Sequence, residues 1–63
     1  PTLDDIKKAY AYLGNVKEEE KKFINDVYIA LFNEEFDFTC GSCGNKQAKR
    51  LHNYLKYELN ASL

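Results

Sequence analysis

The chain has 63 residues, with nine Lys and Arg residues against ten Asp and Glu residues, so its formal net charge is −1. A chain of this length forms a single domain, residues 1–63, whose core is too small to surround a deep catalytic cleft. The near-neutral charge also argues against a protein that binds nucleic acid through its overall electrostatic field. We therefore expect a small domain that is not an enzyme.

The first predicted helix covers residues 3–13. Thr2 is followed three residues later by Asp5, a capping-box pattern that marks the start of a helix. Apolar residues then recur at helical spacing. They are Leu3, Ile6, Ala9, Tyr10 and Leu13. Gly14 and Asn15 tolerate the left-handed backbone that ends a helix.

The second predicted helix begins near Lys17 and ends near Asn33. Three glutamates at residues 18–20 suit its positively charged amino end. A broad apolar stripe follows. It consists of Phe23, Ile24, Val27, Tyr28, Ala30 and Leu31. Phe32 lies outside this stripe, so we interpret it as an aromatic side chain that faces a partner.

Residues 34–39 have no helical pattern. Phe36 and Phe38 alternate with polar residues, which is typical of a short extended piece. A single short piece cannot build a sheet. We therefore expect both rings to close the open end of the helix cluster.

The third predicted helix begins within or just after the CxxC motif of Cys40 and Cys43, with Ser42 or Asn45 as its N-cap. Its inward-facing residues are Ala48, Leu51, Leu55 and Leu59. Residues 60–63 are expected to fray. Together these patterns predict an all-α fold, a compact three-helix domain with an irregular CxxC loop between the second and third helices.

Cys40 and Cys43 are the only cysteines in the chain, and metal binding is the first of three interpretations. A structural zinc ion takes four ligands, but His52 lies about 13 Å along the third helix from Cys43 and cannot join them. Asp37 could complete a site. Alternatively, a second subunit could supply the same pair, so that a shared zinc ion staples an oligomer. Apart from these alternatives we expect no cofactor.

A redox function is the second interpretation of the cysteine pair. A helix amino terminus activates a thiol, but redox CxxC motifs sit on a βαβ framework that this chain lacks. A non-catalytic disulfide would close a very small loop and add little stability. The third interpretation is two reduced, partly buried thiols that cap the helix. We interpret Cys40 and Cys43 as structural residues.

Two sets of surface residues are candidates for binding. Residues 46–56 carry no acidic side chain and four basic ones, Lys46, Lys49, Arg50 and Lys56. This set is either a solvated helix face or a nucleic-acid contact, although the preceding connection is longer than the turn of a helix-turn-helix. Tyr12 and Tyr57 lie off the inward stripes, and with Phe32 they suggest a protein-docking surface.

A resemblance to known proteins spans residues 31–55. The residues that carry it are Leu31-Phe32-Asn33, Cys40-Gly41-Ser42-Cys43, Arg50-Leu51 and Tyr54-Leu55. They resemble small CxxC-containing helical proteins of tailed bacteriophages. The resemblance implies an accessory or virion-associated protein that docks on a larger assembly or on a host protein. It carries over no functional residue beyond the two cysteines.

The expected location and partners follow from what the sequence lacks. No stretch approaches the roughly 20 apolar residues of a membrane span, and no signal-peptide pattern is present. We therefore expect a cytoplasmic or virion-associated protein that has no membrane contact. Its predicted function is a small protein-binding module. A nucleic acid and a second copy of the chain are the alternative partners.

Overall fold

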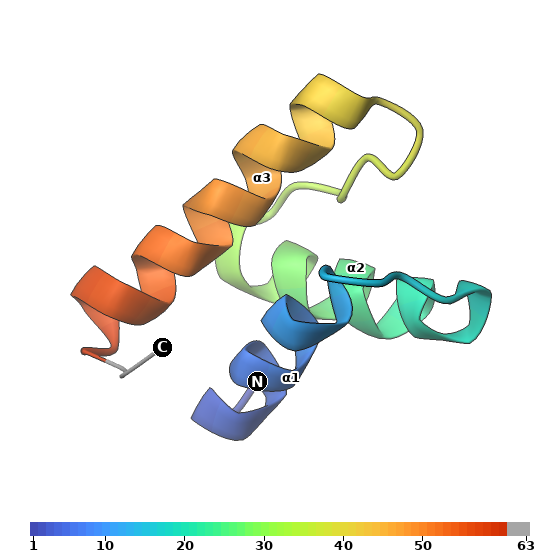
Figure 1. The fold of residues 1–63 in the computed structure, drawn as a ribbon. Helices are drawn as coiled ribbons and strands as arrows, with labels where there is room; N and C mark the ends of the chain where they lie inside the picture. Colours follow the sequence, from blue (N-terminus) through green and yellow to red (C-terminus); the bar gives the residue numbers. More distant parts are fainter. Residues whose placement is uncertain (61–63) are drawn as a thin grey trace.

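The computed structural model describes residues 1–60, which form three α-helices and no strand (Figure 1). In chain order the elements are α1 (Leu3–Tyr12), the 3₁₀ turn η1 (Glu18–Glu20), α2 (Lys21–Phe32), α3 (Gly41–Asn53) and the π-helical segment η2 (Tyr54–Glu58). This arrangement confirms the predicted all-α, three-helix fold. Residues 61–63 of the predicted frayed end lie outside the described residues.

The start of α1 follows the predicted capping box. Thr2 Oγ1 accepts a hydrogen bond from the Asp5 N–H, and the Asp5 carboxylate accepts one from the Thr2 N–H, both at 3.2 Å. These two bonds satisfy donors that the first turn of a helix leaves free. Ile6 and Ala9 are buried, whereas Leu3 at the start of the helix is 41% exposed.

The second helix differs from the prediction at its amino end. The glutamates at Glu18–Glu20 form a separate 3₁₀ turn, in which the Lys17 N–H donates to the Glu20 carboxylate at 3.1 Å. The helix ends as predicted, because Asn33 adopts the left-handed conformation with φ 54° and ψ 38°. Ala30, predicted to lie in the apolar stripe, is exposed.

The core draws on all three helices and on the irregular segment before α3. Its buried residues are Ile6, Ala9, Ile24, Val27, Tyr28, Phe36, Leu51 and Leu55. The Phe36 ring meets the Tyr28 ring edge-on at 5.4 Å, and the half-buried Phe38 ring lies 4.8 Å from Phe36. This packing confirms that the two phenylalanines close one end of the helix cluster.

Among residues 1–60, the Tyr28 hydroxyl is the one buried side-chain polar group that has no hydrogen-bond partner. The residue is 0% exposed, and its hydroxyl makes no hydrogen bond. Burial raises the pKa of the phenol above its usual value, an effect partly opposed by the nearby Arg50. Burial therefore favours the protonated form of the hydroxyl in the folded chain.

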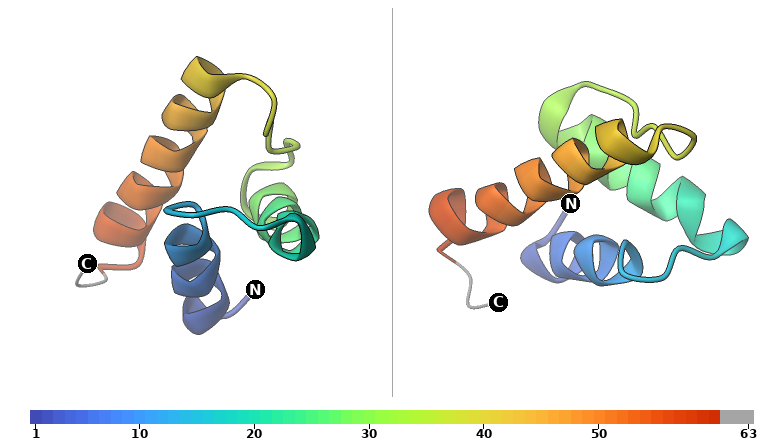
Figure 2. Two further views of the ribbon diagram at one scale, coloured as in Figure 1. Left: turned by 45° about the vertical axis from the view of Figure 1, so that its right-hand side comes forward. Right: turned by 45° about the horizontal axis from the view of Figure 1, so that its top comes forward.

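The two halves of α3 and its extension have different surroundings. Figures 1 and 2 show the helix passing over α1 and α2, with its first turns reached by the segment that leaves α2. The buried residues Leu51 and Leu55 both lie toward its carboxyl end. The amino-terminal turns are held mainly by the preceding segment, and they carry the candidate site.

Candidate functional site

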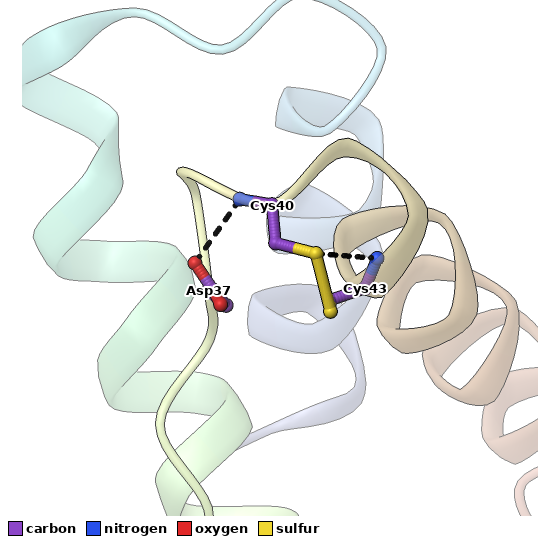
Figure 3. A group of neighbouring side chains, drawn as sticks. All are labelled: Asp37, Cys40 and Cys43. Atoms are coloured by element: carbon purple, nitrogen blue, oxygen red, sulfur yellow. Dashed lines mark hydrogen bonds between the residues drawn. A yellow bond between two sulfur atoms is a disulfide. The ribbon is translucent and has the colours of Figure 1, made fainter.

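Cys40 and Cys43 form a disulfide at the amino terminus of α3 (Figure 3). Their Cα atoms are 5.2 Å apart, a usual separation for a disulfide, and neither cysteine is free. Cys40 is half-buried and Cys43 is exposed. Of the three interpretations of the pair, this structure contains the disulfide.

The N-cap of α3 is Cys40, and the prediction of Ser42 or Asn45 in this position is wrong. The helix begins one residue after Cys40, whose extended backbone lets its sulfur accept a hydrogen bond from the Cys43 N–H at 3.2 Å. Ser42 is already helical, and its hydroxyl lies 3.7 Å from the same sulfur. A disulfide sulfur therefore takes the capping position in which the side-chain oxygen of Ser, Thr, Asp or Asn is usual.

Asp37 lies against the disulfide because a local turn fixes its carboxylate. Its Oδ1 accepts hydrogen bonds from the Thr39 N–H at 2.9 Å, the Thr39 hydroxyl at 2.8 Å and the Cys40 N–H at 3.2 Å. The bonds from Thr39, followed by the bond from Cys40, hold the pKa of Asp37 below its usual value. A carboxylate oxygen and the two sulfurs all lie within 4.8 Å of one another. The structure thus brings together the three residues considered as metal ligands.

Two side-chain amides, which the sequence analysis did not identify, hold the segment before α3 in place. Gln47 accepts a hydrogen bond from the Asp37 N–H at 2.8 Å and donates to the Glu35 carbonyl at 3.0 Å. Asn25 on α2 accepts one from the Phe36 N–H at 2.7 Å. Both amides are half-buried, and their partners are ten to thirteen residues away in sequence. No local pattern could have identified them.

A shallow groove runs beside the disulfide, between the end of α1 and the first turns of α3, and its lining combines apolar side chains with the charged residues Lys21 and Asp37. One hollow of about 230 Å³ is lined by Val16, Phe38, Cys40 and Asn45, among other residues. A neighbouring hollow of about 340 Å³ is lined by Tyr10, Ala11, Leu13, Gly14 and Ala48. Leu13 and Ala48 line both hollows, so the two hollows adjoin one another at these residues. We call this surface the α1–α3 groove.

The basic residues predicted on the third helix are all exposed, but they differ in their contacts. Arg50 stacks over the Phe32 ring at 4.2 Å and pairs with Glu34 at 3.6 Å. The other three are Lys46, Lys49 and Lys56. From Phe38 to Tyr57 the sequence contains no acidic residue. The surface of α3 is therefore basic although the whole chain is almost neutral.

His52 takes no part in the cysteine site. It lies in the last turn of a helix that runs without interruption from Gly41, and its ring packs against Tyr10 at 5.5 Å. A helix rises about 1.5 Å per residue, so the nine residues after Cys43 keep the imidazole out of reach of the sulfurs. This confirms the argument that excluded a site formed by His52 and the two cysteines.

The three aromatic residues predicted to bind protein have different surroundings. Tyr12 is half-buried against Phe23, with a ring separation of 5.8 Å. Phe32 is also half-buried. Its ring packs against Tyr28, which lies in the core, and against Tyr54, which is partly buried. Tyr57 is 70% exposed on η2. Tyr57 is thus the most available of the three for contact with a partner.

Comparison of the chain with protein families, with curated proteins and with solved structures finds no match. Within residues 1–60, no helix is both long enough and apolar enough to cross a membrane.

Proposed function

We propose that this chain is a non-enzymatic protein-binding module that docks on a larger assembly through α3 and the α1–α3 groove. The observation that carries the proposal is the position of a groove, lined largely by apolar residues together with Lys21 and Asp37, beside a helix that itself carries no acidic residue. Such a surface is complementary to a protein segment that presents an apolar side chain flanked by carboxylates. Charge complementarity would guide the encounter, and burial of the apolar side chain would supply affinity.

The spacing of α3 places part of its charge along the groove. Asn45 lines the groove, and Lys49 lies one helical turn further on the same side of the helix. His52, which contacts the groove residue Tyr10, continues this line toward Lys56. The two lysines therefore lie on the same helix face as Asn45 and His52, from which they would pair with carboxylates of a bound segment.

Aromatic side chains extend the proposed surface beyond the groove. Tyr57 lies on η2 within the same stretch that lacks acidic residues, and Lys56 Nζ is 5.3 Å from its ring centre. Tyrosine and arginine are enriched at the centres of protein interfaces. Tyr12 and Phe32 would add partly exposed ring edges at the margins.

The type of assembly is proposed from the resemblance to small CxxC-containing proteins of tailed bacteriophages. Under this proposal the chain is an accessory or virion-associated protein, and its partner is a protein of the particle or of the host. The geometry of the groove bears on the chemistry of the contact and not on the identity of the partner.

Binding of two matched peptides would test the proposed surface. Both peptides form a helix with one leucine face, flanked by glutamates in the first and by lysines in the second. We expect the glutamate peptide alone to bind in fluorescence anisotropy, with binding lost in Ala48→Arg and Lys49→Glu. The control Lys22→Glu removes a cation that pairs with Asp26 on α2 and should bind normally. Equal binding of both peptides, or full binding by folded Ala48→Arg, would contradict the proposal.

Nucleic-acid binding is a second candidate, favoured by the same basic stretch. Lys46, Lys49, Arg50 and Lys56 are the residues that would contact phosphates. Glu34 partly neutralises Arg50, and the connection between α2 and α3 is longer than a helix-turn-helix turn. Anisotropy with duplex DNA at several salt concentrations separates the two candidates. Affinity should fall by about 0.9 log units per log unit of salt for each phosphate contacted, and a flat response would exclude this function.

A further inference from the structure

The corner formed by Asp37, Cys40 and Cys43 has the donor set of a metal site. One carboxylate oxygen and two sulfurs lie within 4.8 Å of one another, on the turn before α3 and on its first turn (Figure 3). A tetrahedral zinc ion, with bonds of about 2.0–2.3 Å, places its ligand atoms about 3.5–3.8 Å apart. Side-chain shifts of about 1 Å would therefore suffice once the sulfurs are no longer bonded.

The surrounding hydrogen bonds orient these donors. Asp37 Oδ1 accepts three hydrogen bonds from Thr39 and Cys40, so the carboxylate is already fixed and its Oδ2 remains available for an ion. The Cys43 N–H donates to the Cys40 sulfur at 3.2 Å. This bond and the positive end of α3 both stabilise a thiolate at Cys40. Outer hydrogen bonds of this kind hold metal ligands in their binding orientation.

We propose that the reduced chain binds one zinc ion through Cys40 Sγ, Cys43 Sγ and Asp37 Oδ2, with solvent as the fourth ligand. A dithiol reductant supplies two electrons and two protons to the Cys40–Cys43 bond and becomes a disulfide itself. Zinc then displaces the two thiol protons into solvent. The disulfide and the metal site are therefore alternative states of one corner, selected by the redox conditions.

The donor chemistry decides which metals fit the site. Two thiolates select thiophilic ions such as zinc, while magnesium and calcium require sites made of oxygen atoms. Three protein ligands with one open position are typical of accessible zinc sites. A zinc ion shared by two copies would instead take four sulfurs, and Asp37 would have no role.

Cobalt is a suitable probe because tetrahedral cobalt bound by thiolates has intense charge-transfer and visible absorption bands. We expect anaerobic titration of the phosphine-reduced chain to give these bands at one ion per chain, and zinc to displace the cobalt. The oxidised chain should give no bands. Cys40→Ser and Cys43→Ser should each abolish the spectrum of the wild-type site.

The variant Asp37→Asn distinguishes the proposed role of Asp37 as a metal ligand from its structural role as a hydrogen-bond acceptor. Asparagine keeps Oδ1 as the acceptor for Thr39 and Cys40 and removes the charged Oδ2, so we expect metal affinity to fall at least tenfold. Asp26→Asn changes a carboxylate that pairs with Lys22 on α2, and its metal affinity should be normal. Circular dichroism of each variant establishes that the helices are intact.

Three results would overturn the proposal. The first is a reduced wild-type chain without thiolate–cobalt bands, and the second is unchanged affinity in folded Asp37→Asn. The third is one ion per two chains together with a dimer in native mass spectrometry, which would indicate a zinc-stapled oligomer. None of these measurements depends on the peptide or DNA experiments, so the metal site and the docking surface can fail separately.

Discussion

The two ends of the α3–η2 helix are held by different forces. Toward its carboxyl end, Leu51 and Leu55 are fully buried among side chains of α1 and α2. At its amino end, Gln47, Asp37 and the disulfide provide polar and covalent links to the irregular segment before α3, of which Phe36 alone is buried. Regions with more buried apolar contacts usually have a higher local free energy of unfolding. We therefore propose that the two ends are independent, so that chemistry at the amino end can change while the core at the other end stays folded.

The largest expected effect comes from Leu51→Ala, which removes apolar packing at the core end. Leucine-to-alanine changes in a buried site cost about 2–5 kcal/mol, against a total stability of about 3–9 kcal/mol for a chain of this size. We expect urea denaturation to show a variant near the limit of folding. Lys46→Ala, at an exposed position, is the control. A loss below about 1 kcal/mol would show that the core end is not the main source of stability.

Asn25→Ala tests the link between the core and the amino end. The change leaves the Phe36 N–H without its 2.7 Å acceptor in a partly buried position, which costs about 1–3 kcal/mol. We expect denaturation at lower urea concentration and faster hydrogen exchange in residues 34–40. Asp26→Ala, at the next position on α2, breaks only an exposed pair with Lys22. Equal effects of the two changes would mean that Asn25 does not anchor the segment.

Reduction of the Cys40–Cys43 disulfide should have a smaller effect. The bond closes a loop with only two residues between the cysteines, so its loss should cost about 2 kcal/mol or less. We expect circular dichroism to retain the helical signal, while hydrogen exchange accelerates in the first turn of α3. Unfolding of the whole chain on reduction would contradict the proposed independence of the two ends.

Tyr28→Phe should have the smallest effect at neutral pH. The hydroxyl is buried without a partner, so its removal should be neutral or slightly stabilising. Burial raises the pKa of Tyr28 in the folded chain, so the unfolded chain loses its phenol proton first as the pH rises. The stability that this pKa difference contributes is fully present below about pH 10 and is lost as the pH rises above it.

Denaturation of the wild type and of Tyr28→Phe at both neutral and alkaline pH measures this effect. The wild type should lose more stability than the variant as the pH rises, because the other tyrosines are common to both chains. An equal loss of stability in the two chains would show that the pKa of Tyr28 is not raised by folding.

Much of the fold follows from local patterns. The Thr2–Asp5 capping box and the left-handed Asn33 mark helix ends, because short-range hydrogen bonding and backbone sterics decide them. The alternation of Phe36 and Phe38 also indicated rings that close the core. The 3₁₀ turn at Glu18–Glu20 was not anticipated, since good helix formers favour either helix type at an amino end.

The candidate site could be predicted only in part. Spacing excluded His52 from the cysteines and left Asp37 as an available ligand, which the structure places beside them. Spacing could not identify Cys40 as the N-cap, because this depends on where α3 begins. Nor could it show that Phe32, assigned to a partner-facing surface, packs against Tyr54.

The sequence by itself determined the elements of this protein: three helices, the start of the first, the end of the second, and a cysteine pair near the start of the last one. These features depend on interactions between residues three or four positions apart, which a linear pattern records. The tertiary structure alone decided what surrounds that pair. The hydrogen bonds of Gln47 and Asn25 and the α1–α3 groove join residues distant in sequence. Such contacts exist only once apolar burial has brought the helices together.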